Sequence, residues 1–133
     1  MELLKKKRKQ RRKPFKLRKS FETRCKECAH LKTQFPDKAP FVMERYRTSN
    51  TIPELEKTKF MFPKDLSMGL VMKFVRDRLP LSPNESLYFF VNETVLVSAS
   101  TTVGEVYQMY AEEDGFVYMT FASQETFGGI SQG

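Results

Sequence analysis

Residues 57–80 read KTKFMFPKDLSMGLVMKFVRDRLP, and this stretch decides the fold class. Residues 57–62 have the composition of a short strand that stops at Pro63. Ser67 is a suitable N-cap for a helix over residues 68–79. The apolar residues of that helix share one face, which is formed by Val71, Phe74, Val75 and Leu79. A strand followed at once by an amphipathic helix indicates an α+β domain.

The residues upstream predict a second strand and an N-terminal helix. Residues 41–46 are typical of a strand, and a polar loop broken by Pro53 joins it to residues 57–62, so we expect an antiparallel hairpin. Ser20 predicts the N-cap of a helix that reaches Gln34, after a helical turn over residues 15–19. The apolar stripe of that helix comprises Phe21, Cys25, Cys28, Leu31 and Phe35.

The residues downstream complete a ubiquitin-like order of elements. The apolar run Leu87–Val91 is typical of a central strand covered on both faces, and residues 95–97 form a short strand. Thr102 and Glu105 match a capping box, which predicts a helix through about Glu112. A turn at Asp114-Gly115 precedes a last strand over residues 116–121. We therefore predict an α+β, ubiquitin-like β-grasp fold, with a mixed sheet, packed helices and two extra N-terminal helices.

The positive charge is concentrated at the N-terminus. Residues 1–14 carry eight basic side chains and one acidic side chain, a net charge of 8 − 1 = +7, whereas the remaining 119 residues carry 15 of each sign. Such a block repels itself and buries nothing, so we expect a disordered arm. Nuclear import, attraction to an anionic membrane, and docking on RNA or a microtubule remain alternative roles for it.

The composition argues against a metal centre, an enzyme and a membrane span. Cys25 and Cys28 form a lone C-x-x-C, and His30 alone does not complete a four-ligand zinc site. No strand precedes the pair, as a redox motif requires, so we expect two small mid-helix residues in a reducing compartment. The chain has one His and no phosphate-binding loop, and the Glu112-Glu113-Asp114 cluster is interpreted as a solvated helix end. No run of about 18 apolar residues occurs, which favours a cytosolic or nucleocytoplasmic protein.

Four blocks stand at fixed spacing: PFVMERY at residues 40–46, KTKF at 57–60, DGFVYM at 114–119 and ASQETFG at 122–128. Together they resemble the microtubule-associated protein light chain 3 family of autophagy-related ubiquitin-like modifiers. The resemblance runs without gaps from about residue 15 to 128, and residues 13–16, 18–20 and 35–36 lean toward the C isoform. After the arm over 1–14, which the charge predicts and which departs from the family pattern, the resemblance implies a domain over 15–122, a conjugation stalk over 123–128 and a removable propeptide over 129–133.

For the C-terminus, the resemblance implies that a cysteine protease cuts after Gly128. Activating and conjugating enzymes then carry the new carboxylate, and the amine of phosphatidylethanolamine receives it. Gly128 has no side chain, so these enzymes can close on its backbone, and Phe127 is implied to position the stalk. Because Gly129 follows, a cut one residue later stays open. The covalent lipid is the one attached group that we expect, with no cofactor.

The resemblance also implies a peptide groove at the outer edge of strand 57–62. Its ligands are extended motifs with an aromatic residue and, three positions on, an aliphatic one, bound by β-augmentation. The implied aromatic pocket comprises Glu27, Leu31, Pro40, Lys59, Met61 and Phe116. The implied aliphatic pocket comprises Phe60, Phe62, Pro63, Val71, Phe74 and Val75, for some of which plain core is the alternative. Lys57 is expected to gate the first pocket, and Arg78 and Arg18 to meet acidic residues beside the motif.

Phe62 is larger than we expect at its position in that family, which predicts a shallower aliphatic pocket that favours a small ligand residue. The implied partners are the protease, the conjugating cascade, autophagy receptors, membrane lipid and microtubules. We expect a cytoplasmic monomer that joins autophagosomal membranes when lipidated, with a nuclear pool attributed to the arm. Two alternatives remain: an unconjugated ubiquitin-like adaptor for motif peptides, and a nuclear, RNA- or microtubule-associated protein that acts through its arm.

Overall fold

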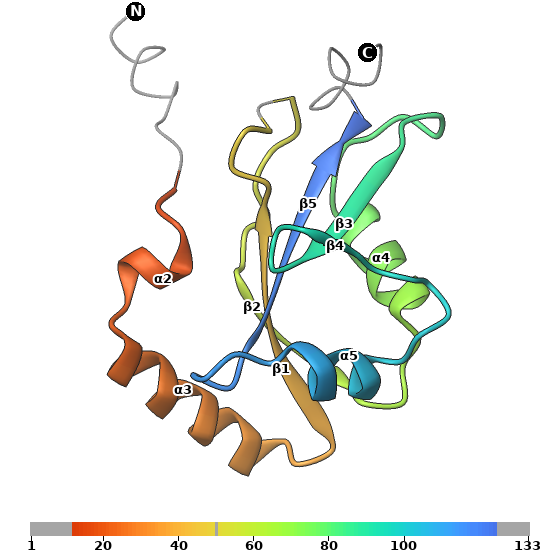
Figure 1. The fold of residues 1–133 in the computed structure, drawn as a ribbon. Helices are drawn as coiled ribbons and strands as arrows, with labels where there is room; N and C mark the ends of the chain where they lie inside the picture. The colour runs from red at the N-terminus through yellow and green to blue at the C-terminus, as the bar shows by residue number, and fades with distance from the viewer. Residues whose placement is uncertain (1–11, 50, 125–133) are drawn as a thin grey trace, which may run out of the picture.

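The computed structural model describes residues 12–49 and 51–124. Its elements are α2 (Phe15–Arg18), α3 (Phe21–Gln34), β1 (Lys38–Arg45), β2 (Lys59–Pro63), α4 (Met68–Arg76), β3 (Leu87–Val91), β4 (Val95–Leu96), α5 (Val103–Tyr110) and β5 (Val117–Ser123), as Figure 1 shows. Most of the predicted arm, and the stalk and propeptide from residue 125 on, lie outside the described residues. Within the described ranges, no helix has the length and apolar character needed to cross a membrane.

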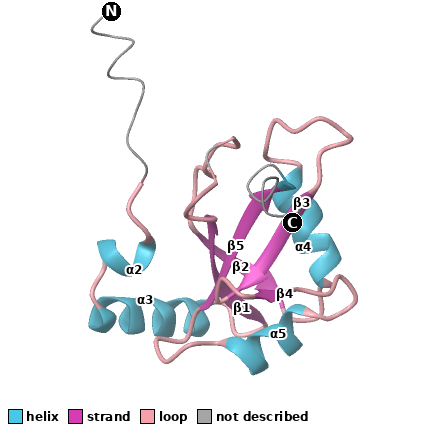
Figure 2. Cartoon of the chain, turned by 45° about the horizontal axis from the view of Figure 1, so that its top comes forward, coloured by secondary structure: helices cyan, strands magenta, loops and turns pink. Residues whose placement is uncertain are grey.

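Five strands form one mixed sheet in the order β2-β1-β5-β3-β4. β1 and β5 run parallel, while β1–β2, β3–β5 and β3–β4 are antiparallel. Helices α2 and α3 lie on one side of this sheet, and α4 and α5 lie on the other, in both views of the chain (Figures 1 and 2). The predicted β-grasp fold with additional N-terminal helices is confirmed.

The strand period of two divides the core between the two sides of the sheet. In β1, Phe41 and Met43 belong to a large cluster with residues of α4 and α5. Val42, which lies between them, belongs instead to a small cluster whose other buried members are Phe15, Cys28, Phe116 and Tyr118. The N-terminal helices are therefore held by a second core of their own.

The predicted caps are present. Ser20 Oγ accepts a hydrogen bond from the Thr23 N–H at 3.2 Å, and Ser67 Oγ accepts one from the Leu70 N–H at 3.2 Å. Thr102 and Glu105 form the full capping box that opens α5. Each cap satisfies backbone donors that a helix start leaves free, which is why these three starts were predictable.

Three predictions about the elements were wrong. Leu87–Val91 is an inner strand, between β5 and β4, but it is not fully covered on both faces: Leu87, Tyr88 and Phe90 are half-buried, whereas β1 and β5 are buried along most of their length. The apolar stripe on α3 is mostly surface: Cys28 is buried, but Phe21 and Phe35 are 49% and 40% exposed. Helix α4 ends at Arg76 and α5 at Tyr110, each earlier than its pattern predicted.

Candidate functional site

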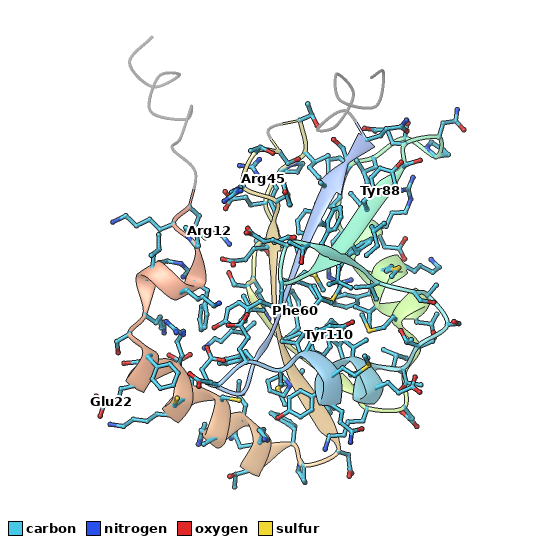
Figure 3. The ribbon with its side chains drawn as sticks, viewed as in Figure 1. Arg12, Glu22, Arg45, Phe60, Tyr88 and Tyr110 are labelled. Atoms are coloured by element: carbon cyan, nitrogen blue, oxygen red, sulfur yellow. The ribbon has the colours of Figure 1, made fainter. Side chains whose placement is uncertain are left out.

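The candidate site is the outer edge of β2, which is the first strand of the sheet. Along it Lys59 is exposed, Phe60 and Met61 are half-buried and Phe62 is buried. A groove of about 650 Å³ follows this edge, and Figure 3 labels Phe60 on it. The groove is lined by Glu54, Leu55, Glu56, Lys57, Lys59, Phe60, Met61, Phe74 and Arg78. A strand edge beside a groove is the geometry that β-augmentation needs.

The residues of the predicted aromatic pocket lie together between α3 and β2. Glu27 of α3 binds Lys59 Nζ at 2.8 Å and Lys19 Nζ at 2.6 Å. Pro40 is the cross-strand partner of Met61, and Leu31 packs on the small core that contains Phe116. Pro40 and Phe116 are buried, and of the six residues Lys59 and Met61 line the groove. The two lysines and Glu27 close the region between α3 and β2 at the surface.

Two lysines hold Glu27 in its ionised form. Burial by itself raises the pKa of this carboxyl group, but the hydrogen bonds and charges of Lys19 and Lys59 outweigh it, so the pKa lies below its ordinary value of 4.5. The bridge Lys19–Glu27–Lys59 therefore ties the N-terminal helices to β2 at neutral pH.

The predicted aliphatic pocket is filled by aromatic rings. Phe60 and Phe62 stack with centroids 5.8 Å apart, and Phe74 of α4 stands edge-on to both, at 5.6 Å and 5.5 Å. The guanidinium carbon of Arg78 lies 3.5 Å from the centroid of the Phe74 ring. Val71 and Val75 are fully buried members of the large core and do not line the groove. For these two residues the core alternative is the one that the structure supports.

A second hollow, of about 410 Å³, lies on the other side of Lys57 and Lys59. Five of its eight lining residues are cations: Arg12, Arg18, Lys19, Lys57 and Lys59. The Thr58 hydroxyl accepts hydrogen bonds from Arg12 Nη1 and Arg18 Nη2, both at 3.2 Å. Arg18 and Lys57 thus lie together, in a basic hollow that continues the groove.

Arg12 is a site residue that sequence reasoning assigned to the arm. Its Nη2 donates to the Leu55 carbonyl oxygen at 2.9 Å, and its Nε lies 3.4 Å from Glu54 Oε1. Figure 3 shows Arg12 reaching from the segment before α2 toward the loop on which Arg45 also acts. No local pattern distinguishes Arg12 from the seven other basic residues of the arm, so its role was not visible in the sequence.

Asp114 is a second residue that sequence reasoning misplaced, as part of a solvated helix end. Its side chain is 2% exposed and accepts from Arg24 Nε at 2.9 Å, from the Phe116 N–H at 2.9 Å and from the Tyr118 hydroxyl. Burial, together with this carboxylate, raises the pKa of Tyr118 above its ordinary value. Asp114 therefore links Arg24 of α3 to Tyr118 of β5. This link holds α3, which carries Glu27 of the site, against the sheet.

The cysteines have a structural environment. Both lie inside α3, as predicted, and burial raises the pKa of Cys28 to about 11. Such a thiol is a poor nucleophile at neutral pH. Across residues 12–49 and 51–124, no three His, Cys, Asp or Glu side chains gather as a metal site would require.

The predicted conjugation residues, Phe127 and Gly128, lie outside the described residues. Strand β5 ends at Ser123, one residue before the end of the described chain. The Ser123 hydroxyl is hydrogen-bonded to the Thr51 hydroxyl at 2.7 Å. The Gln124 N–H donates to the Ser86 carbonyl oxygen at 3.3 Å. The described part of the chain therefore ends close to Ser86, just before β3, at the end of β5.

The mixed five-stranded sheet, its packed helices and the open edge strand define a ubiquitin-like protein with a second helical layer. The profile of the family described as "Autophagy protein Atg8 ubiquitin like" matches residues 23–128. The chain belongs to this Atg8 family.

Curated relatives carry the same family names. The chain is 49% identical over 115 residues to human "Microtubule-associated protein 1 light chain 3 gamma", over 86% of this chain and 78% of that protein. It is 40% identical to rice "Autophagy-related protein 8D" over 86% and 97% of the two chains. The crystal structure of Trypanosoma brucei ATG8 superposes with a TM-score of 0.77 at 30% identity, over 86% of this chain and 97% of that one. The predicted family is confirmed, and the lean toward a C isoform stays a prediction.

Proposed function

We propose that the chain is a ubiquitin-like modifier of autophagy that recruits receptors through short aromatic-x-x-aliphatic motifs. The open edge of β2 carries this proposal, because an extended peptide can add there as a sixth strand. Lys57, Lys59 and Arg78 line the groove, and Arg12, Arg18 and Lys19 line the neighbouring hollow. These six cations favour motifs with acidic neighbours, whose association they steer.

Calorimetric titration with an acidic motif peptide tests the peptide groove. Lys59→Ala and Phe60→Ala are expected to weaken binding about tenfold each, without unfolding the domain. The matched control is Leu96→Ala, at the opposite edge of the sheet, where the side chain is 62% exposed. Unchanged affinity in both groove variants would remove the assignment.

We further propose that the chain is processed at Gly128 and conjugated to phosphatidylethanolamine. The family match, which ends at residue 128, supports this assignment, as does the glycine itself. A processing cysteine protease and the activating and conjugating enzymes of the cascade are then partners. Attachment to a lipid with two acyl chains provides the membrane anchor.

Intact mass before and after incubation with a processing protease tests this step and decides between the two candidate cuts. Loss of residues 129–133 corresponds to a cut after Gly128, and loss of 130–133 to a cut after Gly129. Gly128→Ala is expected to abolish lipid attachment and to leave peptide affinity unchanged, whereas Gly129→Ala preserves both. A chain that binds peptide but keeps its full mass is the unconjugated adaptor.

A cytoplasmic monomer that moves to autophagosomal membranes on lipidation follows from this proposal. A nuclear pool and microtubule association remain proposals for the basic arm. Imaging of the tagged full chain with and without residues 1–11 tests them, since loss of either location on deletion would assign it to the arm.

A further inference from the structure

Aromatic rings bound the groove on β2 where a leucine or isoleucine anchor is expected to enter. Val71 and Val75, two of the residues expected to form the aliphatic pocket, are 0% exposed, and Phe62 is 5% exposed. None of the three lines the groove, which is bounded in this region by Phe60, Phe74 and Arg78. An incoming side chain therefore meets ring surfaces where the sequence predicted a pocket.

Phe62 closes the space from below. Its ring packs edge-on against Phe41 at 5.5 Å in the core and stacks on Phe60 at 5.8 Å on the groove side. Val71 and Val75 of α4 belong to the same buried core as Phe62. Phe62 thus packs between Phe41 in the core and Phe60, which lines the groove.

Phe74 and Arg78 close the same space from the side. Phe74 stands edge-on to Phe60 and Phe62 at interplanar angles of 83° and 85°, so the three rings interlock. Arg78 covers the Phe74 ring, and its Nη1 donates to the Phe74 carbonyl oxygen at 3.1 Å. A side chain longer than valine would have to displace this packed group.

We propose that the groove selects acidic motif peptides whose second anchor is a short side chain, alanine or valine, because Phe62 and Phe74 occupy the space that leucine or isoleucine needs. This inference rests on the proposed peptide-binding function and specifies its ligand. Phe62 and Phe74 are specificity-determining residues. Lys57 and Arg78 line the groove together with Glu54 and Glu56, and these two cations are the groups that would meet acidic residues of the motif.

The test uses four peptides, identical but for the second anchor, with the pattern Asp-Asp-Glu-Phe-Ser-Glu-Xaa-Glu and Xaa as Ala, Val, Leu or Ile. Each methylene buried in an open apolar pocket strengthens binding roughly fourfold. In the wild-type protein, Leu and Ile are expected to bind at least about threefold more weakly than Ala and Val, because the larger anchors must displace packed rings. In Phe62→Val, Leu is expected to bind at least about tenfold better than Ala.

Phe62 is a core residue, so Phe62→Val also removes packing from the core. Phe74→Ala therefore serves as a second variant. Phe74 is only half-buried, so its loss costs less packing, and it is expected to shift the series toward Leu in the same direction. Leu96→Ala on the far edge is expected to leave the wild-type series unchanged. Methyl NMR adds a direct readout: contacts from the peptide Leu methyls to Val75 are expected in Phe62→Val and not in the wild type.

The outcomes separate the two proposals. A steep preference for Leu in the wild type overturns the specificity inference and keeps peptide binding. A flat series in the wild type and in both folded variants also overturns it, since the rings would then not set the preference. A fifth peptide, in which the Phe of the pattern is replaced by Ala, is the control for the first anchor. If none of the four peptides binds the folded wild type more tightly than this control does, the groove function itself is overturned.

Discussion

Gly115 shows how one residue fixes the junction of the two cores. Its φ is +98°, a conformation that side chains disfavour, and a Cβ there would lie 2.5 Å from Cys28 Sγ. The turn before β5 can therefore pack directly on α3 only if residue 115 is glycine. The small size of Cys28 serves the same close approach.

Gly115→Ala is expected to lower the free energy of unfolding by about 2 kcal/mol or more, since a left-handed residue with a Cβ costs about 1–2 kcal/mol before any clash. Urea unfolding of the single variant and of Gly115→Ala with Cys28→Ala separates the two causes. The part of the lost free energy of unfolding that the double variant recovers measures the clash with Cys28. The part that it does not recover measures the cost of the positive φ at residue 115. A single variant as stable as the wild type would contradict the account.

Asp114 is expected to be the most sensitive charged residue of the domain. Asp114→Ala leaves Arg24 and the Tyr118 hydroxyl without their shared acceptor in a site where Asp114 is 5% exposed. Breaking a buried pair on one side costs about 3–5 kcal/mol. Denaturant titration checks this, with Glu113→Ala, an exposed neighbour, as the matched control that should change little.

At the scale of elements, the bridge from α3 to β2 links the N-terminal helices to the groove. Glu27 holds Lys19 and Lys59 at once, and its pKa is lowered as a result. A lowered folded-state pKa contributes stability above the ordinary value of 4.5, and this contribution is lost as the pH falls through that value and below.

Glu27→Gln therefore gives a pH-dependent difference from the wild type. At pH 7 the wild type is expected to be the more stable protein, and the difference is expected to shrink as the pH falls below about 4.5. Thermal unfolding across pH 3 to 7 measures it. A difference that is constant over this range would indicate that the bridge does not act through the charge of Glu27.

The sequence predicted the helix starts and the β-grasp fold, but not the burial of individual strands and helix faces. Ser20, Ser67 and Thr102 marked helix starts because a cap is a contact between residues three apart. Leu87–Val91 is an inner strand as predicted, but its incomplete burial was not predictable, because the cover on each face depends on which distant elements pack there. In the site, Lys59 was recognisable as an edge lysine, whereas the roles of Arg12 and Asp114 depend on contacts 40 to 90 residues away.

At the scale of the whole molecule, the charge divides at Arg12. Residues 1–11 carry six basic and one acidic side chain, a net 6 − 1 = +5, and the remainder carries 17 basic and 15 acidic, a net 17 − 15 = +2. Since Arg12 is bound to Glu54, Leu55 and Thr58, the arm begins at a fixed point beside the basic hollow.

Deletion of residues 1–11 is expected to leave the free energy of unfolding unchanged and to remove most of the salt-dependent binding to anionic vesicles or RNA. Vesicle co-sedimentation and RNA filter binding at two salt concentrations measure this. Deletion through residue 12 is the comparison, because it also removes the contacts of Arg12. RNA binding that survives the shorter deletion with a steep salt dependence would place a nucleic-acid surface on the domain.

The parallel pairing of β1 with β5 has a consequence for biosynthesis. At the centre of the sheet, residues 41–45 pair with residues 117–121. The central pairing therefore cannot form until residues 117–121 have left the ribosome. Until then β1 presents an unpaired edge, which makes the nascent chain prone to misassembly. A premature stop before β5 therefore removes the central strand of the sheet, and no smaller folded domain is expected.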